Sequence, residues 1–206
     1  MTPTARHTAS AAGRDAASPV RERLLSVATR LFAQNGFEAT SVQQVVEAAG
    51  VTKGALYHYY DSKDDLLYEV YHRLLTMQRA RLDEIASGPG GPAERLEAAA
   101  ADVLRTTFEN MDDMIVFFRS LHLLPAARQA LIRTERRSYH KRFRQLVDEG
   151  IAAGAFRADV PADIVVQYFL SAINQLGTWY RPDGPLSPDQ IGRYFTGLLM
   201  TGLQGS

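Results

Sequence analysis

The stretch from Val51 to Tyr60 gathers side chains and backbone groups that can donate hydrogen bonds to a polyanion. Thr52 can cap a short helix with its hydroxyl, which leaves the N–H groups of the first turn and their positive dipole end facing a phosphate. Ala55 and Leu56 are expected to face inward. The predicted outward positions, which suit contacts in the major groove of DNA, are Lys53, Gly54, Tyr57, His58 and Tyr59.

The aromatic residues of this stretch have a second interpretation, in which they seal the corner of a small helical bundle. We assign Tyr60 to the core, and Tyr57 and Tyr59 to the DNA groove or its phosphate walls. An apolar segment, Val42 to Ala49, lies just before it, and Gly50 suits the tight corner between two helices. The pattern therefore predicts a helix-turn-helix.

Two further helices are expected to support this corner. Apolar residues recur at helical spacing from Val20 to Asn35, and a long fourth helix begins after Ser62. Ser41 starts the Ser-x-x-Gln pattern of a capping box, so the helix that follows it should begin at Val42. Ser41 and Gln43 can then reach the DNA backbone, and Lys63 is either a phosphate contact or a solvated charge.

The run from Arg21 to Tyr71 resembles the DNA-binding domain of the TetR family of bacterial transcriptional regulators. The resemblance implies an all-α fold and favours a phosphate contact for Lys63. With the positions that match the family pattern, the predicted DNA contacts are Thr40, Ser41, Gln43, Thr52, Lys53, Gly54, Tyr57, His58, Tyr59 and Lys63. The matching segments are Ala28 to Phe32, Asn35 to Phe37, Thr40 to Val42, Ala48 to Val51, Lys53 to Tyr60 and Ser62 to Leu67.

Composition narrows the class of protein. The chain has 206 residues, 46% of them hydrophobic, and it lacks cysteine, which excludes disulfides and thiolate sites and fits a reducing cytoplasm. Neither a membrane-spanning run nor a secretory signal is present, so we expect a soluble cytoplasmic protein. The formal net charge is zero, so DNA binding must depend on a few placed contacts, with Arg6, Arg14, Arg21 and Arg23 adding phosphate attraction.

Three regions are predicted along the chain. Residues 1–19 read as a disordered arm, residues 20–87 as the helix-turn-helix DNA-binding domain with the connecting fourth helix, and residues 88–206 as a ligand-binding and dimerisation domain. The boundary is placed at the loop Gly88 to Pro92. Beyond it no strand pattern occurs, and helices are expected at 93–110, 113–124, 126–153, 162–180 and 188–203.

Methionine and aromatic residues concentrate in the second domain. They form either an ordinary helical core or the lining of an apolar ligand cavity, which such side chains can shape well. We expect most of them in the core and some at a cavity. The predicted ligand-binding residues are Met111, Met114, Phe118, Arg119, His122, Arg137, Phe143, Phe169, Ile173 and Trp179.

A cationic helix face follows this segment, with Arg133, Arg137, His140, Lys141 and Arg144 at three-to-four-residue spacing. It is either a solvated, ion-paired face or a site for the phosphates of an anionic ligand. The segments 150–156 and 174–187 resemble the branch of TetR regulators that control fatty-acid or sterol-ring catabolism. That resemblance implies an acyl-CoA thioester as effector.

The last two helices carry enough apolar surface either to close a monomer core or, as the family resemblance implies, to form a dimer. The predicted dimer residues are Val165, Tyr194, Phe195, Leu198 and Leu199. A dimer would place two recognition helices in neighbouring major grooves of a palindromic operator. The whole pattern predicts a homodimeric repressor that a small molecule releases from DNA, without catalytic residues, metal or cofactor.

Three alternatives remain at this stage. The first is an activator or constitutive regulator of the same fold. The second is a helical enzyme that would use Glu109, Asp112, Asp113 and His122, although no nucleophile–base pair or tight ligand spacing supports it. The third is an acyl-CoA binding module without DNA function.

Overall fold

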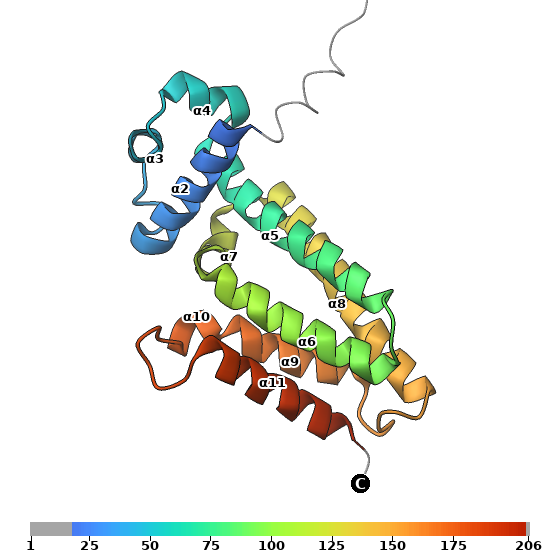
Figure 1. Ribbon diagram of the computed structural model, residues 1–206. Helices are drawn as coiled ribbons and strands as arrows, with labels where there is room; N and C mark the ends of the chain where they lie inside the picture. The colour runs from blue at the N-terminus through green and yellow to red at the C-terminus, as the bar shows by residue number, and fades with distance from the viewer. Residues whose placement is uncertain (1–17, 205–206) are drawn as a thin grey trace, which may run out of the picture. The chain divides into compact units, whose positions relative to one another are not determined.

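The computed structural model describes residues 18–204, and within that range every regular element is a helix (Figure 1). The predicted all-α fold is therefore confirmed. The predicted arm, residues 1–19, lies outside the described residues except for Ser18, which precedes the first helix, and Pro19, which begins it. No helix in the described part of the chain is both long and apolar enough to cross a membrane.

The chain divides into two compact units, Met1–Val70 and Tyr71–Ser206. This division falls inside α5 (Lys63–Ala86), whereas the sequence placed the boundary at the Gly88 to Pro92 loop. The difference arises because Leu82 and Ala86, on the second half of α5, pack in the core of the C-terminal unit. Helix α5 therefore contributes to both units.

The N-terminal unit contains α2 (Pro19–Asn35), α3 (Val42–Ala49), α4 (Lys53–Tyr59) and the first turns of α5. Helix α2 packs against both α3 and α4. Their apolar faces form a small core in which each side chain is almost fully buried. Its members include Leu24, Leu25, Phe32, Val45, Val46, Leu56, Leu66 and Leu67.

The C-terminal unit continues with α6 (Pro92–Glu109), α7 (Met111–Ser120), the 3-10 turn η1 (Leu121–Leu123), α8 (Ala126–Ala152), α9 (Ala162–Asn174), α10 (Leu176–Trp179) and α11 (Pro188–Leu203). Helix α6 packs on α8 and α11, and α9 packs on α8 and α11 (Figure 1). The centre of this core includes Leu96, Phe143, Leu146, Val166 and Phe169.

One predicted helix is interrupted in the structure. The segment expected to run from 162 to 180 ends at Asn174 and resumes as the short α10. Both the backbone N–H and the hydroxyl of Thr178 donate to the carbonyl of Gln175, at 2.9 and 2.7 Å. This three-residue spacing tightens the chain relative to an α-helix and separates the two segments.

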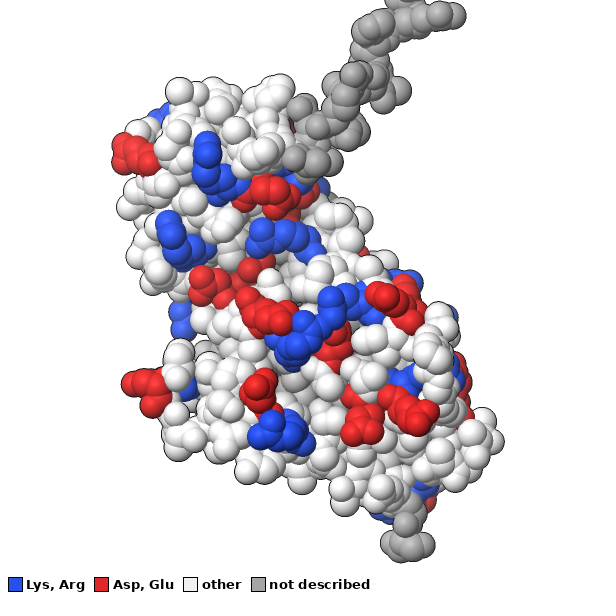
Figure 2. All heavy atoms as spheres, in the orientation of Figure 1, with Lys and Arg blue, Asp and Glu red and all other residues white. Residues whose placement is uncertain are grey.

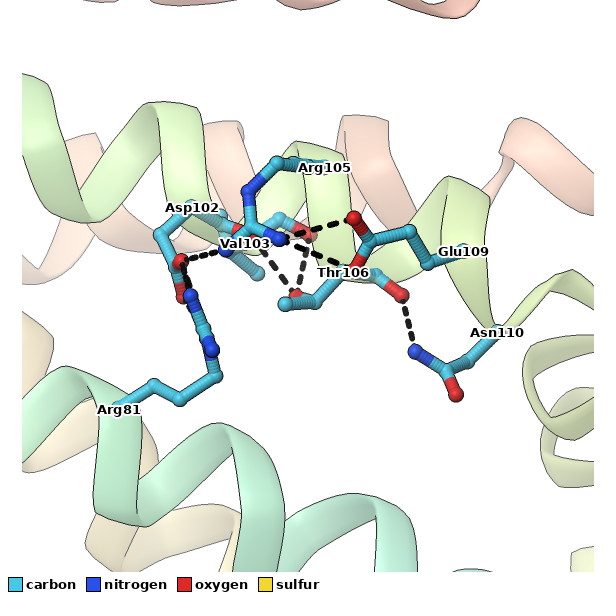
Figure 3. A network of polar contacts seen from close by, with 7 residues as sticks. All are labelled: Arg81, Asp102, Val103, Arg105, Thr106, Glu109 and Asn110. Carbon is cyan, nitrogen blue, oxygen red and sulfur yellow. Dashed lines mark hydrogen bonds and ion pairs between the residues drawn. The ribbon is translucent and has the colours of Figure 1, made fainter.

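Helices α5 and α6 are joined by a network of charged side chains (Figure 3). The Arg81 guanidinium donates to both oxygens of Asp102, at 2.6 and 3.0 Å, and Arg105 contacts both Asp102 and Glu109. Burial alone would raise the pKa of Asp102, but the hydrogen bonds and charges of the two arginines outweigh it and hold that pKa below its usual value.

Candidate nucleic-acid interface and ligand pocket

The corner between α3 and α4 has the local geometry that the sequence predicted. Ser41 and Gln44 form a reciprocal capping box, so α3 begins at Val42. Gly50 follows α3 in the left-handed conformation, with φ 63° and ψ 40°. A side chain at Gly50 would be strained there, because L-residues other than Asn and Asp rarely adopt positive φ.

Helix α4 presents polar groups on one side and apolar groups on the other. The hydroxyl of Thr52 accepts from the N–H of Ala55 at 3.2 Å, which is the predicted cap. Leu56 and Tyr60 are buried, as predicted, while the Tyr57 side chain is 51% exposed. The remaining predicted contacts exposed at this corner are Ser41, Gln43, Thr52, Lys53, Gly54 and His58.

Tyr59 is more constrained than its predicted role suggested. Its side chain is half-buried, and its hydroxyl forms a hydrogen bond with the Ser18 hydroxyl at 2.8 Å. The ring also contacts His58 edge-on, with centroids 4.8 Å apart. Tyr59 therefore fixes the start of α2 against α4 within the N-terminal unit.

Thr40 has a different position from the one that the sequence predicted. Its side chain is 0% exposed, and its hydroxyl donates to the carbonyl of Gly36 at 2.8 Å. A side chain held in this way cannot reach DNA, so Thr40 is corrected to a structural residue. Thr40 was predicted as a DNA contact because it matches the family pattern. That pattern contains both residues that contact DNA and residues that hold the loop between α2 and α3.

Lys63 holds the same loop from the other side. Its ammonium donates to the carbonyls of Phe37 and Thr40, at 2.8 and 2.9 Å, and lies 4.3 Å from the centroid of the Phe37 ring. These contacts account for the charge within the protein. The predicted phosphate contact of Lys63 stays a prediction beside this structural role.

Charges of both signs are mixed over the surface. On the face drawn in Figure 2, the described Lys and Arg residues alternate with Asp and Glu and form no continuous basic surface. Arg21, one of the predicted phosphate-attracting residues, pairs with Glu69 at 2.6 Å. Together with the formal net charge of zero, this mixture on the drawn face favours DNA binding through individual contacts over a broad positive field.

The C-terminal unit contains a pocket of about 420 Å³. Helices α5 to α9 all contribute to it, with apolar side chains and polar side chains in similar numbers. Its lining is Leu74, Leu75, Gln78, Val103, Thr107, Met114, Phe117, Phe118, Arg133, Arg136, Arg137, Tyr139, His140, Gln167, Leu170, Ser171, Ile173 and Asn174.

Four predicted ligand-binding residues line this pocket: Met114, Phe118, Arg137 and Ile173. The other six lie outside the lining, which corrects the sequence prediction. Phe143 and Phe169 pack on each other in the core, with their ring centroids 5.8 Å apart, and Met111 packs against that core. Trp179 stacks on Phe195, while Arg119 and His122 are exposed.

The sequence missed the contributions of α5 and α6 to the pocket. Leu74, Leu75 and Gln78 belong to a helix that the sequence assigned to the DNA-binding domain. No sequence pattern marked Thr107 as a pocket residue. For Arg136, the only indication in the sequence was its position on the cationic helix, three residues after Arg133.

Two contacts tie the pocket-lining helix α7 to α5. The Tyr71 hydroxyl donates to the carbonyl of Val116 at 3.1 Å, and Arg73 pairs with the buried Asp113 at 2.6 Å. Burial raises the pKa of Asp113 above its usual value, although the hydrogen bond from Arg73 opposes the shift. Helix α5 is thus held directly by an element of the pocket.

A basic groove of about 290 Å³ adjoins the pocket along α8. It is lined by Arg137, His140, Lys141, Arg144 and Asp163, and it shares Arg137 and His140 with the pocket. Arg144 pairs with Asp163 at 3.2 Å, whereas Arg137 and Lys141 have no ion-pair partner among residues 18–204. The groove can therefore attract an anion.

Helices α9 and α11 expose an apolar surface, which we call the α9–α11 face and define by Ile164, Tyr168, Tyr194 and Leu198. Leu198 is 67% exposed, whereas Leu199, also predicted at the dimer interface, is 5% exposed and packs in the core. Leu199 is therefore corrected to a core residue. Val165 and Phe195 are half-buried and pack at the edge of that core.

Two family models match the chain. The model for bacterial regulatory proteins of the tetR family matches residues 24–70, and the model for the tetracyclin repressor-like C-terminal domain matches residues 89–203, more than half of the chain. The chain belongs to the TetR family. The resemblance inferred from the residues is confirmed, and the protein is a helix-turn-helix transcriptional regulator and not an enzyme.

Relatives match over nearly the whole chain. The transcriptional repressor KstR2 of Mycolicibacterium smegmatis is 27% identical over 191 residues, covering 90% of this chain and 91% of its own. The structure of the ketosteroid transcriptional regulator KstR2 of Mycobacterium tuberculosis superimposes with a TM-score of 0.81 at 26% identity, covering 93% of this chain and 98% of its own. AibR, solved with isovaleryl coenzyme A and operator DNA, shares the fold with a TM-score of 0.79 at 22% identity, covering 90% and 100%.

Two of the four residues considered for an enzymatic site form ion pairs within the fold. Asp113 pairs with Arg73, and Glu109 pairs with Arg105. Within residues 18–204, no group of three or more His, Asp and Glu side chains is placed to hold a metal ion.

Proposed function

We propose that this regulator is a homodimeric repressor that binds a palindromic operator and is released from it by an acyl-CoA thioester. Its relative KstR2 is a transcriptional repressor, which supports the sign of regulation. Each part of the proposal depends on a different surface of the chain.

DNA recognition is assigned to the exposed side of α4. Thr52 leaves the first turn of α4 open to a phosphate, and Lys53, Tyr57 and His58 are exposed beyond it. A helix of this length, with its apolar side buried on α2, can insert its polar side into the major groove. Ser41 and Gln43, at the start of α3, would contact the phosphate backbone beside it.

The observation that carries the ligand assignment is that the pocket and the basic groove share two lining residues. Arg137 and His140 border both, so one elongated molecule can place an apolar group in the pocket and anionic groups along Arg137 and Lys141. Arginine binds phosphate oxygens in a fork, which suits such a ligand. An acyl-CoA thioester has this division, and AibR, a protein of the same fold, was solved with isovaleryl coenzyme A.

Dimerisation is assigned to the α9–α11 face. Exposed Tyr168 and Leu198 would lose contact with water when two copies pair, which is a favourable change. A two-fold dimer then presents two α4 helices to half-sites about 34 to 36 Å apart, or a multiple of that distance. This requirement is why the operator is expected to be palindromic.

Release is assigned to α5, which is continuous between the two units. Its residues Tyr71 and Arg73 bond to α7, and α7 supplies Met114 and Phe118 to the pocket. A ligand that moves α7 would therefore bias the position of α5. It can release DNA only by the difference between its affinities for the two states of the protein.

The test is fluorescence anisotropy of labelled DNA taken from upstream of the gene, titrated with the protein at fixed salt. Acyl-CoA thioesters and their free acids are then added to the complex. Release by thioesters alone supports the proposal, while specific binding that no thioester reverses would remove the acyl-CoA assignment. Reporter expression after deletion of the gene separates a repressor, whose loss raises expression, from an activator.

A further inference from the structure

Polar groups inside the ligand pocket lack partners from the described residues. Arg136 forms neither a hydrogen bond nor an ion pair with any residue between 18 and 204, and no partner in the structure meets the Thr107 hydroxyl or the His140 Nε2 atom. All three residues line the same pocket. The Thr107 hydroxyl and the His140 Nε2 atom are buried, and buried polar groups normally have partners.

Arg136 differs from the other two because it is half-buried and carries a charge. Its guanidinium lies over two aromatic rings, 5.1 Å from the centroid of Phe117 and 5.8 Å from that of Phe118. Loss of hydration lowers its pKa, yet an arginine remains charged under ordinary conditions. The rings stabilise this charge in part, but they leave its N–H donors unused.

Several arginines of the C-terminal unit that are partly buried between helices have carboxylate partners. Arg73 pairs with Asp113, Arg81 with Asp102 and Arg95 with Glu149. These pairs join one helix to another and account for the charge within the fold. Arg136 has the same chemistry without a carboxylate from the described residues, so its guanidinium is available to a carboxylate of a bound ligand.

Thr107 repeats this contrast on α6. The neighbouring Thr106 donates its hydroxyl to the carbonyl of Asp102 at 2.9 Å, the usual arrangement for threonine inside a helix. Thr107 is 0% exposed, lines the pocket and leaves its hydroxyl unused. The His140 Nε2 atom is also buried without a hydrogen-bond partner, and His140 lines both the pocket and the basic groove.

These groups give the pocket a direction. His140 borders the groove that we assign to the anionic part of the ligand, and Arg136 lies one turn earlier on α8, away from the groove. Four residues of α-helix span roughly 6 Å. A short acyl group with its thioester near His140 would therefore place its far end beside Arg136.

We infer that the effector's acyl group carries a carboxylate of its own, and that Arg136 binds this carboxylate while Thr107 and His140 hydrogen-bond to other oxygen atoms of the acyl group. This inference rests on the proposed function, because it describes the acyl end of the same ligand. The ligand class is a dicarboxylic acyl thioester, not a plain fatty acyl thioester.

The experiment compares two thioesters that differ only at the far end of the acyl chain. Adipoyl-CoA ends in a carboxylate and hexanoyl-CoA in a methyl group, and each is titrated into the full-length protein by isothermal calorimetry. We expect adipoyl-CoA to bind about 10-fold tighter or more, the usual scale of a charge-assisted hydrogen bond. In Arg136→Met, which keeps an unbranched apolar stem over Phe117, this preference should disappear while hexanoyl-CoA still binds.

Arg119→Met is the matched control, because Arg119 is an exposed arginine on α7 outside the pocket lining. It should retain the wild-type affinities for both thioesters. Binding of hexanoyl-CoA by Arg136→Met, with an unchanged circular dichroism spectrum, shows that the variant is folded. An Arg136→Lys variant should recover part of the preference, since it restores the charge without the fork of donors.

Three results would overturn the inference: equal affinities of the wild type for the two thioesters, a preference that survives in Arg136→Met, or an equal loss of both ligands in that variant. The last result would place Arg136 against the coenzyme A part. If neither thioester binds, the thioester assignment of the proposed function fails on its own. Octanoate and 1-octanol then decide the subsite: an Arg136-dependent preference for octanoate supports it, and equal or absent binding refutes it.

Discussion

The N-terminal and C-terminal units differ in how far their functional residues follow from local sequence. In the N-terminal unit, the exposed polar residues proposed to contact DNA lie on the seven-residue helix α4 and at the start of α3. Helix caps and helical periodicity in the sequence predict the exposure of most of these residues. In the C-terminal unit, the pocket takes residues from five helices. A recognition surface built on one helix is thus largely local, whereas a cavity depends on how several helices pack.

The largest effect is expected from a change that breaks the N-terminal unit alone. Leu56→Ala removes a fully buried side chain from its small core, which should cost about 2 to 5 kcal/mol of stability. Operator binding should be lost, while the C-terminal unit keeps its own core. Thermal unfolding and anisotropy measure the loss, and the pocket is checked with the ligand that binds the wild type. Loss of the pocket as well would show that the two units do not fold independently.

A smaller effect on DNA binding is expected from the surface of the same helix. Tyr57→Ala removes an exposed ring without touching the core, so it should weaken operator binding about 10-fold or more and leave dimerisation and melting temperature intact. Anisotropy and sedimentation measure the two properties. His72→Ala, a change outside the N-terminal unit, is the control. Unchanged operator affinity in Tyr57→Ala would remove this residue from the recognition surface.

In the C-terminal unit, the sharpest test of packing is the Asp102 network. Asp102→Asn leaves Arg81 without its carboxylate partner and Arg105 with Glu109 alone, and it should cost about 1 to 3 kcal/mol at pH 7. The folded-state pKa of Asp102 is depressed, so its contribution is present above the unfolded pKa, about 3.9, and is lost as the pH falls through the folded value. The difference in melting temperature between wild type and variant should therefore shrink below about pH 4, as measured by circular dichroism. A constant difference down to pH 2 would contradict the ionic origin.

The smallest effect separates the two roles of Lys63. Lys63→Met removes the hydrogen bonds to the carbonyls of Phe37 and Thr40, which should cost about 1 kcal/mol in the N-terminal unit. If Lys63 also contacts a phosphate, the slope of log affinity against log salt should fall by about 1. Anisotropy across a salt series gives that slope. An unchanged slope with lower stability would leave Lys63 with the structural role alone.

Helical period does not specify how much of a helix face is buried. Leu199 lies in a helix that the sequence predicted, yet its side chain points into the core. A helical period specifies which residues share a face, but the width of the buried part of that face depends on the neighbouring helix. Phe143 and Phe169 illustrate the same limit, because an aromatic side chain in a core and one at a cavity have the same local pattern.

The sequence by itself determined the helical fold, the capped corner around Gly50 and which residues of α4 are exposed or buried, because caps, turns and helical period act over a few neighbouring residues. Only the tertiary structure decided that α5 lines the pocket, that the pocket and the basic groove share Arg137 and His140, and that Arg136 and Thr107 line the same pocket. These features depend on the packing of helices far apart in the chain, where the space left between side chains is a property of several helices together.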